Sequence, residues 1–207
     1  MVYLRAIYDP IRHQLHPDRP PGQLFPLISL SELQAAGPGH LERLRTELFR
    51  EAATLAMLAA TALACSRNPR QWLAAFLIAF GIWDISFYAG LKILIDWPLS
   101  LLTWDILFLL PVPWVGPVLA PVLVSISMIG AGLLVFHRDL SGNLRPFRWF
   151  HWGLVYLGGF IVVLAFTWDF RNTAAGGLPN PFHWALFFAG EAAGLSGCAL
   201  ALRVKSI

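Results

Sequence analysis

Two acidic residues lie inside long apolar stretches of this chain, each within a nearly repeated phrase. The phrase Trp-Asp-Ile-x-Phe occurs at residues 83–87 and again at residues 104–108, and a third acid, Glu191, lies in an apolar stretch near the end of the sequence. An isolated negative charge is costly in apolar surroundings, so such carboxylates hold a proton, bind a cation or line water. The chemistry that these residues suggest is therefore the binding of a proton or a cation.

Neutral side chains with oxygen atoms accompany the acids. Tyr88 lies one helical turn after Asp84, on the same face of a helix, and Ser125 and Ser127 lie at the centre of another apolar stretch. Carboxylate and hydroxyl oxygens are ligands that hard cations such as calcium, magnesium and manganese accept. The candidate ion- or proton-binding residues are Asp84, Asp105, Glu191, Tyr88, Ser125 and Ser127.

The composition assigns the chain to the integral membrane proteins. Hydrophobic residues make up 57% of its 207 residues and charged residues only 13%, whereas soluble domains are about half apolar and about a quarter charged. The lipid bilayer is thus the first expected partner. The net charge of +3 is modest, and basic residues in a membrane protein chiefly report its orientation, so a nucleic-acid partner is not expected.

Apolar stretches along the chain predict an all-α bundle of six transmembrane helices. The expected spans are about 46–65, 72–95, 98–114, 115–136, 149–168 and 182–203. Residues 39–207 then form the transmembrane domain, and residues 1–38 form a polar, proline-rich cytoplasmic arm with one short helix. Ser29 and Glu32 have the spacing of a capping box, in which each side chain satisfies a backbone N–H at the start of a helix.

The stretch 98–114 is short for a span, and Pro111 and Pro113 interrupt its end. The alternative is five spans plus a re-entrant half-helix at 98–114. Six spans leave eleven lysines and arginines in the arm, the 137–148 loop and the tail on one side and three on the other, whereas five spans leave seven on each side. The positive-inside rule therefore favours six spans, both termini in the cytoplasm, and a bacterial-type cytoplasmic (inner) membrane.

The centres of three expected spans fall at the acids. Asp84, Asp105 and Glu191 each lie within about one turn of the predicted midplane, and no lysine, arginine or histidine lies at that depth. A charge at the bilayer centre costs about 2.5–3.5 kcal/mol even on the lenient insertion scale. A shared acidic site is the sharper hypothesis, and protonated acids that only hydrogen-bond neighbouring helices are the plainer one.

Two segments are candidate gates at the outer surface. Pro111, Pro113 and Trp114 form a rigid turn at the end of the third expected span, and Asp169 and Arg171 open the longest outer loop. Proline-rich turns and loops at the mouth of a site are common positions for gates or head-group contacts.

Two glutamates precede the first expected span. Glu47 and Glu51 lie one turn apart on one helical face. The Glu-x-x-His pattern of di-metal carboxylate sites is absent from the sequence. We therefore interpret these glutamates as part of a salt-bridged helix entry.

Three functions remain open from the sequence. A proton- or cation-binding transporter is the leading hypothesis. An accessory subunit of a respiratory or photosynthetic complex would use the nine tryptophans for packing, and a membrane-embedded enzyme would use the acids as metal ligands or as an acid/base pair. A bound cation is the one cofactor considered, since covalent haem would require a Cys-x-x-Cys-His motif that is absent. Other membrane proteins and a second copy of the chain are candidate partners.

Overall fold

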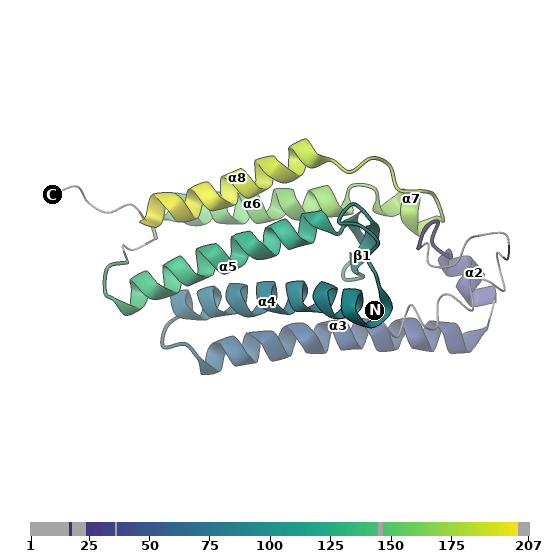
Figure 1. Ribbon diagram of the computed structural model, residues 1–207, viewed down its shortest axis with the longest axis horizontal. Helices are drawn as coiled ribbons and strands as arrows, with labels where there is room; N and C mark the ends of the chain where they lie inside the picture. The colour runs from purple at the N-terminus through teal and green to yellow at the C-terminus, as the bar shows by residue number, and fades with distance from the viewer. Residues whose placement is uncertain (1–16, 18–23, 36, 145–146, 203–207) are drawn as a thin grey trace.

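The computed structural model is a bundle of long helices with a small β-hairpin at one end (Figure 1). It describes residues 17, 24–35, 37–144 and 147–202. The elements in chain order are α2 (Leu30–Ala35), α3 (Pro38–Ala64), α4 (Pro69–Ile95), β1 (Trp104–Phe108), β2 (Trp114–Pro117), α5 (Leu119–Leu140), α6 (Trp149–Thr167), α7 (Phe170–Ala174) and α8 (Trp184–Leu202).

Four helical segments are long and apolar enough to cross a membrane. They are α4, α5, the segment Trp149–Ala174 that contains α6, and α8. Large apolar side chains on these helices point outward, among them Leu133 and Leu134 on α5, Phe160 on α6 and Phe188 on α8. Outward apolar surface along several long helices is what a bilayer solvates, so the chain is a multi-pass, mostly helical membrane protein that contacts lipid.

Glycines bring the spanning helices together in two pairs, α4 with α5 and α6 with α8. A Cβ atom added at Gly132 of α5 would lie 2.8 Å from the carbonyl oxygen of Ala74 on α4. A Cβ atom added at Gly158 of α6 would lie 2.4 Å from the amide nitrogen of Gly194 on α8. Close backbone approach at small residues is the usual basis of helix packing in membranes.

Helix α3 runs antiparallel beside α4 (Figure 1). The Trp72 indole donates to the carbonyl oxygen of Ala59 at 3.1 Å and joins the two helices. The first expected span, 46–65, lies within this helix, but the sequence of α3 is not among the four apolar enough to span. Its N-terminal half carries charged residues and extends past the hairpin (Figure 1).

The expected third span is wrong. Residues 98–114 form no helix, and the chain between α4 and α5 instead contains the antiparallel strands β1 and β2. The prediction of six spans fails with it, and so does the alternative of a helical re-entrant segment. The physical reason is local: Trp104, Ile106 and Phe108 alternate with Asp105 and Leu107, which is the period of a strand, and the prolines at 111 and 113 cannot continue a helix.

The hairpin packs against the end of the helix bundle, where β2 is buried. Val115, Gly116 and Pro117 of β2 are buried, and a Cβ atom at Gly116 would lie 2.9 Å from the Phe166 ring of α6. On its other side, Val115 packs with Phe25 and Leu27, which precede α2. The expected capping box of α2 is confirmed, because Ser29 Oγ accepts from the Glu32 N–H and Glu32 Oε2 accepts from the Ser29 N–H.

The hairpin changes the path of the chain through the membrane. Helices α4 and α5 both meet it, so their connection stays at one end of the bundle, which we call the hairpin end (residues 96–118 and 168–183). The opposite end, residues 65–70, 138–144 and 147–148, we call the basic end. Helix α3 begins at the hairpin end and α8 ends at the basic end (Figure 1). The expectation that both termini lie in the cytoplasm stays a prediction. Lysines and arginines among the described residues divide about evenly between the ends, so they no longer fix the orientation.

Candidate functional site

Asp84 lies near the middle of α4 and faces α5. Ser125 Oγ donates to Asp84 Oδ2 at 2.9 Å, and both side chains are buried. Gly81, one turn earlier, permits this contact, because a Cβ atom there would lie 2.7 Å from the Ser125 carbonyl oxygen. The small residue thus lets two spanning helices approach closely enough for a carboxylate to bind a hydroxyl across them.

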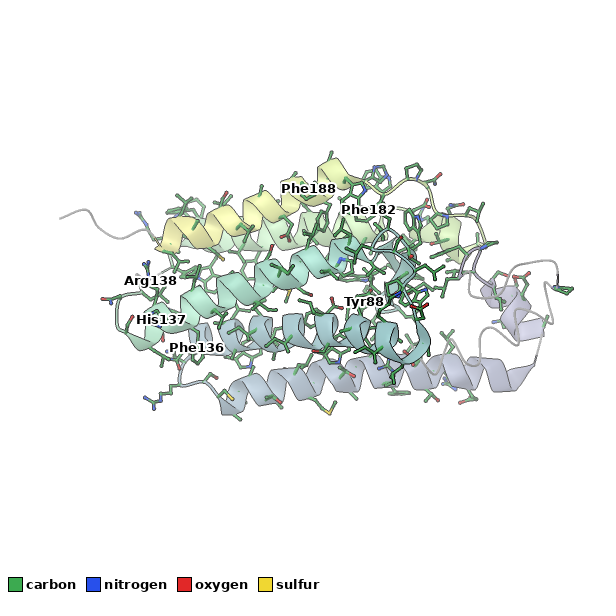
Figure 2. All side chains as sticks on the ribbon, viewed as in Figure 1. Tyr88, Phe136, His137, Arg138, Phe182 and Phe188 are labelled. Atoms are coloured by element: carbon green, nitrogen blue, oxygen red, sulfur yellow. The ribbon has the colours of Figure 1, made fainter. Side chains whose placement is uncertain are left out.

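Asp105 lies on β1 and is completely buried. The Tyr88 hydroxyl donates to Asp105 Oδ2 at 3.1 Å, and Figure 2 shows Tyr88 on α4 beside the hairpin. Because Tyr88 is four residues after Asp84 on one face of α4, the two aspartates lie along the same side of that helix. The fold therefore brings together four of the predicted site residues: Asp84, Asp105, Tyr88 and Ser125.

Glu51 of α3 joins this group, although sequence reasoning assigned it to the helix entry. Its side chain is buried, and its Oε2 accepts from the backbone N–H of Leu109 at 3.0 Å. Burial raises the pKa of Glu51 above the usual value for a glutamate, and the Leu109 N–H opposes that rise. The signal in the sequence was the one-turn spacing of Glu47 and Glu51, but it did not reveal that a hairpin would fold onto α3.

The neighbouring Glu47 forms the expected ion pair. Arg50 Nε donates to Glu47 Oε2 at 2.9 Å, and a second guanidinium nitrogen of Arg50 contacts Glu47 Oε1. The salt-bridged helix entry is thus confirmed for Glu47. It also means that the positive charge of Arg50 is engaged beside the site.

A pocket opens between α3, α4 and β1, and the acids lie on its wall. Glu51 and Asp84 line it, Tyr88 links it to Asp105, and aromatic rings supply most of the remaining surface. The described residues that line it are Arg50, Glu51, Thr54, Trp83, Asp84, Phe87, Tyr88, Leu107 and Phe108. Arg50 is the cationic side chain among these described residues. Among the described residues, no three His, Cys, Asp or Glu side chains lie close enough together to hold a metal ion. The arrangement instead suits a proton, or a cation that shares the pocket with water.

Glu191 belongs to a different contact. It lies half-buried on α8, and its carboxyl group is close to Ser127 of α5. Ser125 and Ser127 are two residues apart, so they point about 200° apart around the axis of α5. The structure therefore groups the predicted residues into two sets: Asp84, Asp105, Tyr88 and Ser125 on one side of α5, and Glu191 with Ser127 on the other.

The candidate gate residues lie at the hairpin end. Trp114 begins β2 and stacks on Phe166 at 6.2 Å between ring centroids, while Pro111 and Pro113 lie in the turn before it. Asp169 accepts from the Asn180 N–H at 2.8 Å and so organises the loop before α8. The nearby Arg171 is exposed and lies over the Phe170 ring, 5.8 Å from its centroid.

Comparison of the chain with protein-family models, with curated proteins and with solved structures gave no match.

Proposed function

We propose that this protein binds and moves a proton or a small cation through the pocket between α3, α4 and the hairpin. Asp84 and Asp105 are the ion-carrying pair, Tyr88 and Ser125 are their neutral partners, and Glu51 is a third carboxylate at the pocket. The observation that carries the proposal is the pair of hydrogen bonds from Ser125 to Asp84 and from Tyr88 to Asp105, in which a hydroxyl group donates to each of two buried carboxyl groups.

Electrostatics favour a bound proton or cation at this pair. Burial disfavours the charged form of a carboxyl group, so a bound proton or cation is favourable at each of these two aspartates. On the pocket wall, the cation among the described residues is Arg50, and Glu47 engages it. Buried acids inside the membrane are the usual elements of proton relays in transporters.

A route across the bundle follows from the positions of the remaining acids. Glu51 lines the same pocket as Asp84 and binds the hairpin through the Leu109 N–H. Glu191 and Ser127, on the opposite face of α5, are the second relay position in this proposal. Pro111, Pro113, Trp114 and the loop at Asp169 and Arg171 cover the hairpin end as its gate. A bacterial-type cytoplasmic membrane, which maintains a proton gradient, is the location that such a site would use.

The test is ion flux in vesicles. The purified chain is reconstituted into liposomes that contain a pH-sensitive dye, and a proton or sodium gradient is imposed. Asp84→Asn and Asp105→Asn each keep an oxygen that accepts the existing hydrogen bond but cannot titrate, so flux is expected to fall to the level of protein-free vesicles. Asp96→Asn is the matched control, because Asp96 caps the same helix α4 but is exposed and pairs with Lys92 outside the pocket.

Equal flux in Asp84→Asn and in Asp96→Asn vesicles would reject the carrier role of the pair. Absence of flux from wild-type vesicles, together with co-purification in a large complex after mild solubilisation, would favour the accessory-subunit hypothesis instead. Metal that is bound to the wild-type chain without ion flux, and that is lost in both aspartate variants, would favour the enzyme hypothesis.

A further inference from the structure

A second pocket lies at the basic end, away from the acidic site. It opens between the α4–α5 pair and the α6–α8 pair, and Cys198 of α8 is one of its lining residues. Its surface is aliphatic and aromatic except for the thiol and one charged residue, Arg70 in the first turn of α4. The residues that define it best are Arg70, Leu77, Ala131, Val135, Phe147 and Trp152. We call this pocket the basic-end groove.

The groove has the polarity of a phospholipid that stands in one leaflet. Arg70 and Leu77 are seven residues apart on α4, so the groove extends about 10 Å along the helix. Trp152 in the first turn of α6 also lines it, and tryptophan is enriched at the membrane–water interface. The groove surface is thus apolar, and the Arg70 stem that lines one end of it carries a charged group.

The charges around the mouth favour an anionic head group. Four arginines, Arg67, Arg70, Arg138 and Arg148, lie at this end, where Asp139 is the one acid among the described residues. Figure 2 shows Arg138 at this end of α5. Basic pockets between transmembrane helices are known recognition sites for anionic lipid head groups.

Arg70 keeps hydrogen-bonding capacity for a phosphate. Its contact to Asp139 is long, 3.7 Å, and its side chain is 42% exposed. Asp139 is already satisfied at 2.8 Å by the side-chain amides of Asn68 and Gln71. A guanidinium has five N–H donors and binds phosphate oxygens in pairs, so Arg70 can bind a phosphate without leaving Asp139 unpaired.

We propose that the basic-end groove binds one acyl chain of an anionic phospholipid, with the lipid phosphate at Arg70. Such a lipid would fill the space between the two helix pairs and hold them in register. The site is independent of the acidic pocket, since it shares no lining residue with it.

Native mass spectrometry of the full chain in detergent tests this proposal. The chain is titrated with phosphatidylglycerol and, separately, with phosphatidylcholine of the same acyl chains. We expect the first phosphatidylglycerol to bind about fivefold more tightly than phosphatidylcholine, the factor that corresponds to one arginine near an anionic head group. Arg70→Gln should remove this preference. Arg67→Gln, which neutralises an exposed arginine at the same end but outside the groove, should retain it.

The groove itself is tested by filling it. Ala131→Trp should weaken the first binding event for both lipids, and the smaller change Ala131→Leu should weaken it less. Thermal unfolding of each variant is measured in the same detergent as the wild type, as a check that the helix bundle is folded. An equal loss of preference in Arg67→Gln and Arg70→Gln would overturn the proposal, because it would show only a general surface charge. Unchanged binding in both folded Ala131 variants would overturn it as well.

Discussion

The hydrogen bond between Ser125 and Asp84 gives a direct measure of the charge on the buried pair. A double-mutant cycle of Ser125→Ala, Asp84→Ala and the combined variant isolates the interaction energy of the two side chains. The Oγ to Oδ2 distance of 2.9 Å and the burial of both residues make this a direct hydrogen bond between the two side chains. The coupling energy therefore depends mainly on whether the carboxyl group is ionised.

The two charge states predict different magnitudes. A neutral hydrogen bond between membrane helices contributes about 0.6 kcal/mol, whereas a bond to a charged group contributes about 1.5–3 kcal/mol. Because the proposed pair holds a proton, we expect a coupling of about 0.6 kcal/mol in mildly acidic solution without added metal cations. The assay is the free energy of unfolding in mixed micelles, measured by titration with a denaturing detergent.

A matched cycle controls for changes in helix packing. Ser127→Ala removes a hydroxyl group from the same helix, but Ser127 lies near Glu191 on the other face of α5. Its coupling to Asp84→Ala should be close to zero. A Ser125–Asp84 coupling of 2 kcal/mol or more, within the range for a charged partner, would show an ionised Asp84 and would refute the reasoning behind the proton-bearing pair.

Three further outcomes follow from the packing and the charges. Gly158→Ala places a Cβ atom 2.4 Å from the Gly194 amide and should destabilise the bundle by about 1–3 kcal/mol, whereas Gly159→Ala on the same helix meets nothing within 4 Å and should not lower the unfolding midpoint. If the two alanine variants unfold alike, the α6–α8 contact is wrong. The raised pKa of Glu51 means that the folded state binds its proton more tightly than the unfolded state. Its contribution to stability is therefore complete below the unfolded pKa of about 4.3 and is lost as the pH rises through the folded value. Glu51→Gln should flatten this decline of the unfolding midpoint with pH, while the exposed variant Glu42→Gln should follow the wild type; a wild-type midpoint that rises over that range would contradict the burial of Glu51. In the vesicle assay, Glu51→Gln should also slow ion flux, since it removes the third carboxylate of the pocket, and flux equal to that of the Glu42→Gln protein would remove Glu51 from the route.

Much of the candidate site followed from the sequence because it depends on local features. A carboxylate in a long apolar run identified Asp84 and Asp105, and the four-residue spacing identified Tyr88 as a neighbour on the same face. The capping box at Ser29 and Glu32 was also visible, since it needs only the spacing of two side chains. The composition alone established a multi-pass, helical membrane protein.

The error at 98–114 has a different origin. Length and hydrophobicity do not distinguish a short span from a buried hairpin, because both must exclude water from an apolar run. The alternation from Trp104 to Phe108 was the local signal for a strand. Its consequence, a connection that begins and ends at one end of the bundle, changed the number of spans and removed the basis for the orientation.

The sequence by itself determined which residues cannot remain as isolated charges in this protein, since the cost of burying a carboxylate depends on the surrounding apolar run. Only the tertiary structure decided which of them meet. It placed Asp105 against Tyr88 and brought Glu51 to the pocket through the hairpin, and it separated Glu191 from them on the far side of α5. Those contacts join segments distant in the chain, and their geometry depends on helix rotation and on the fold of the hairpin, which no local spacing contains.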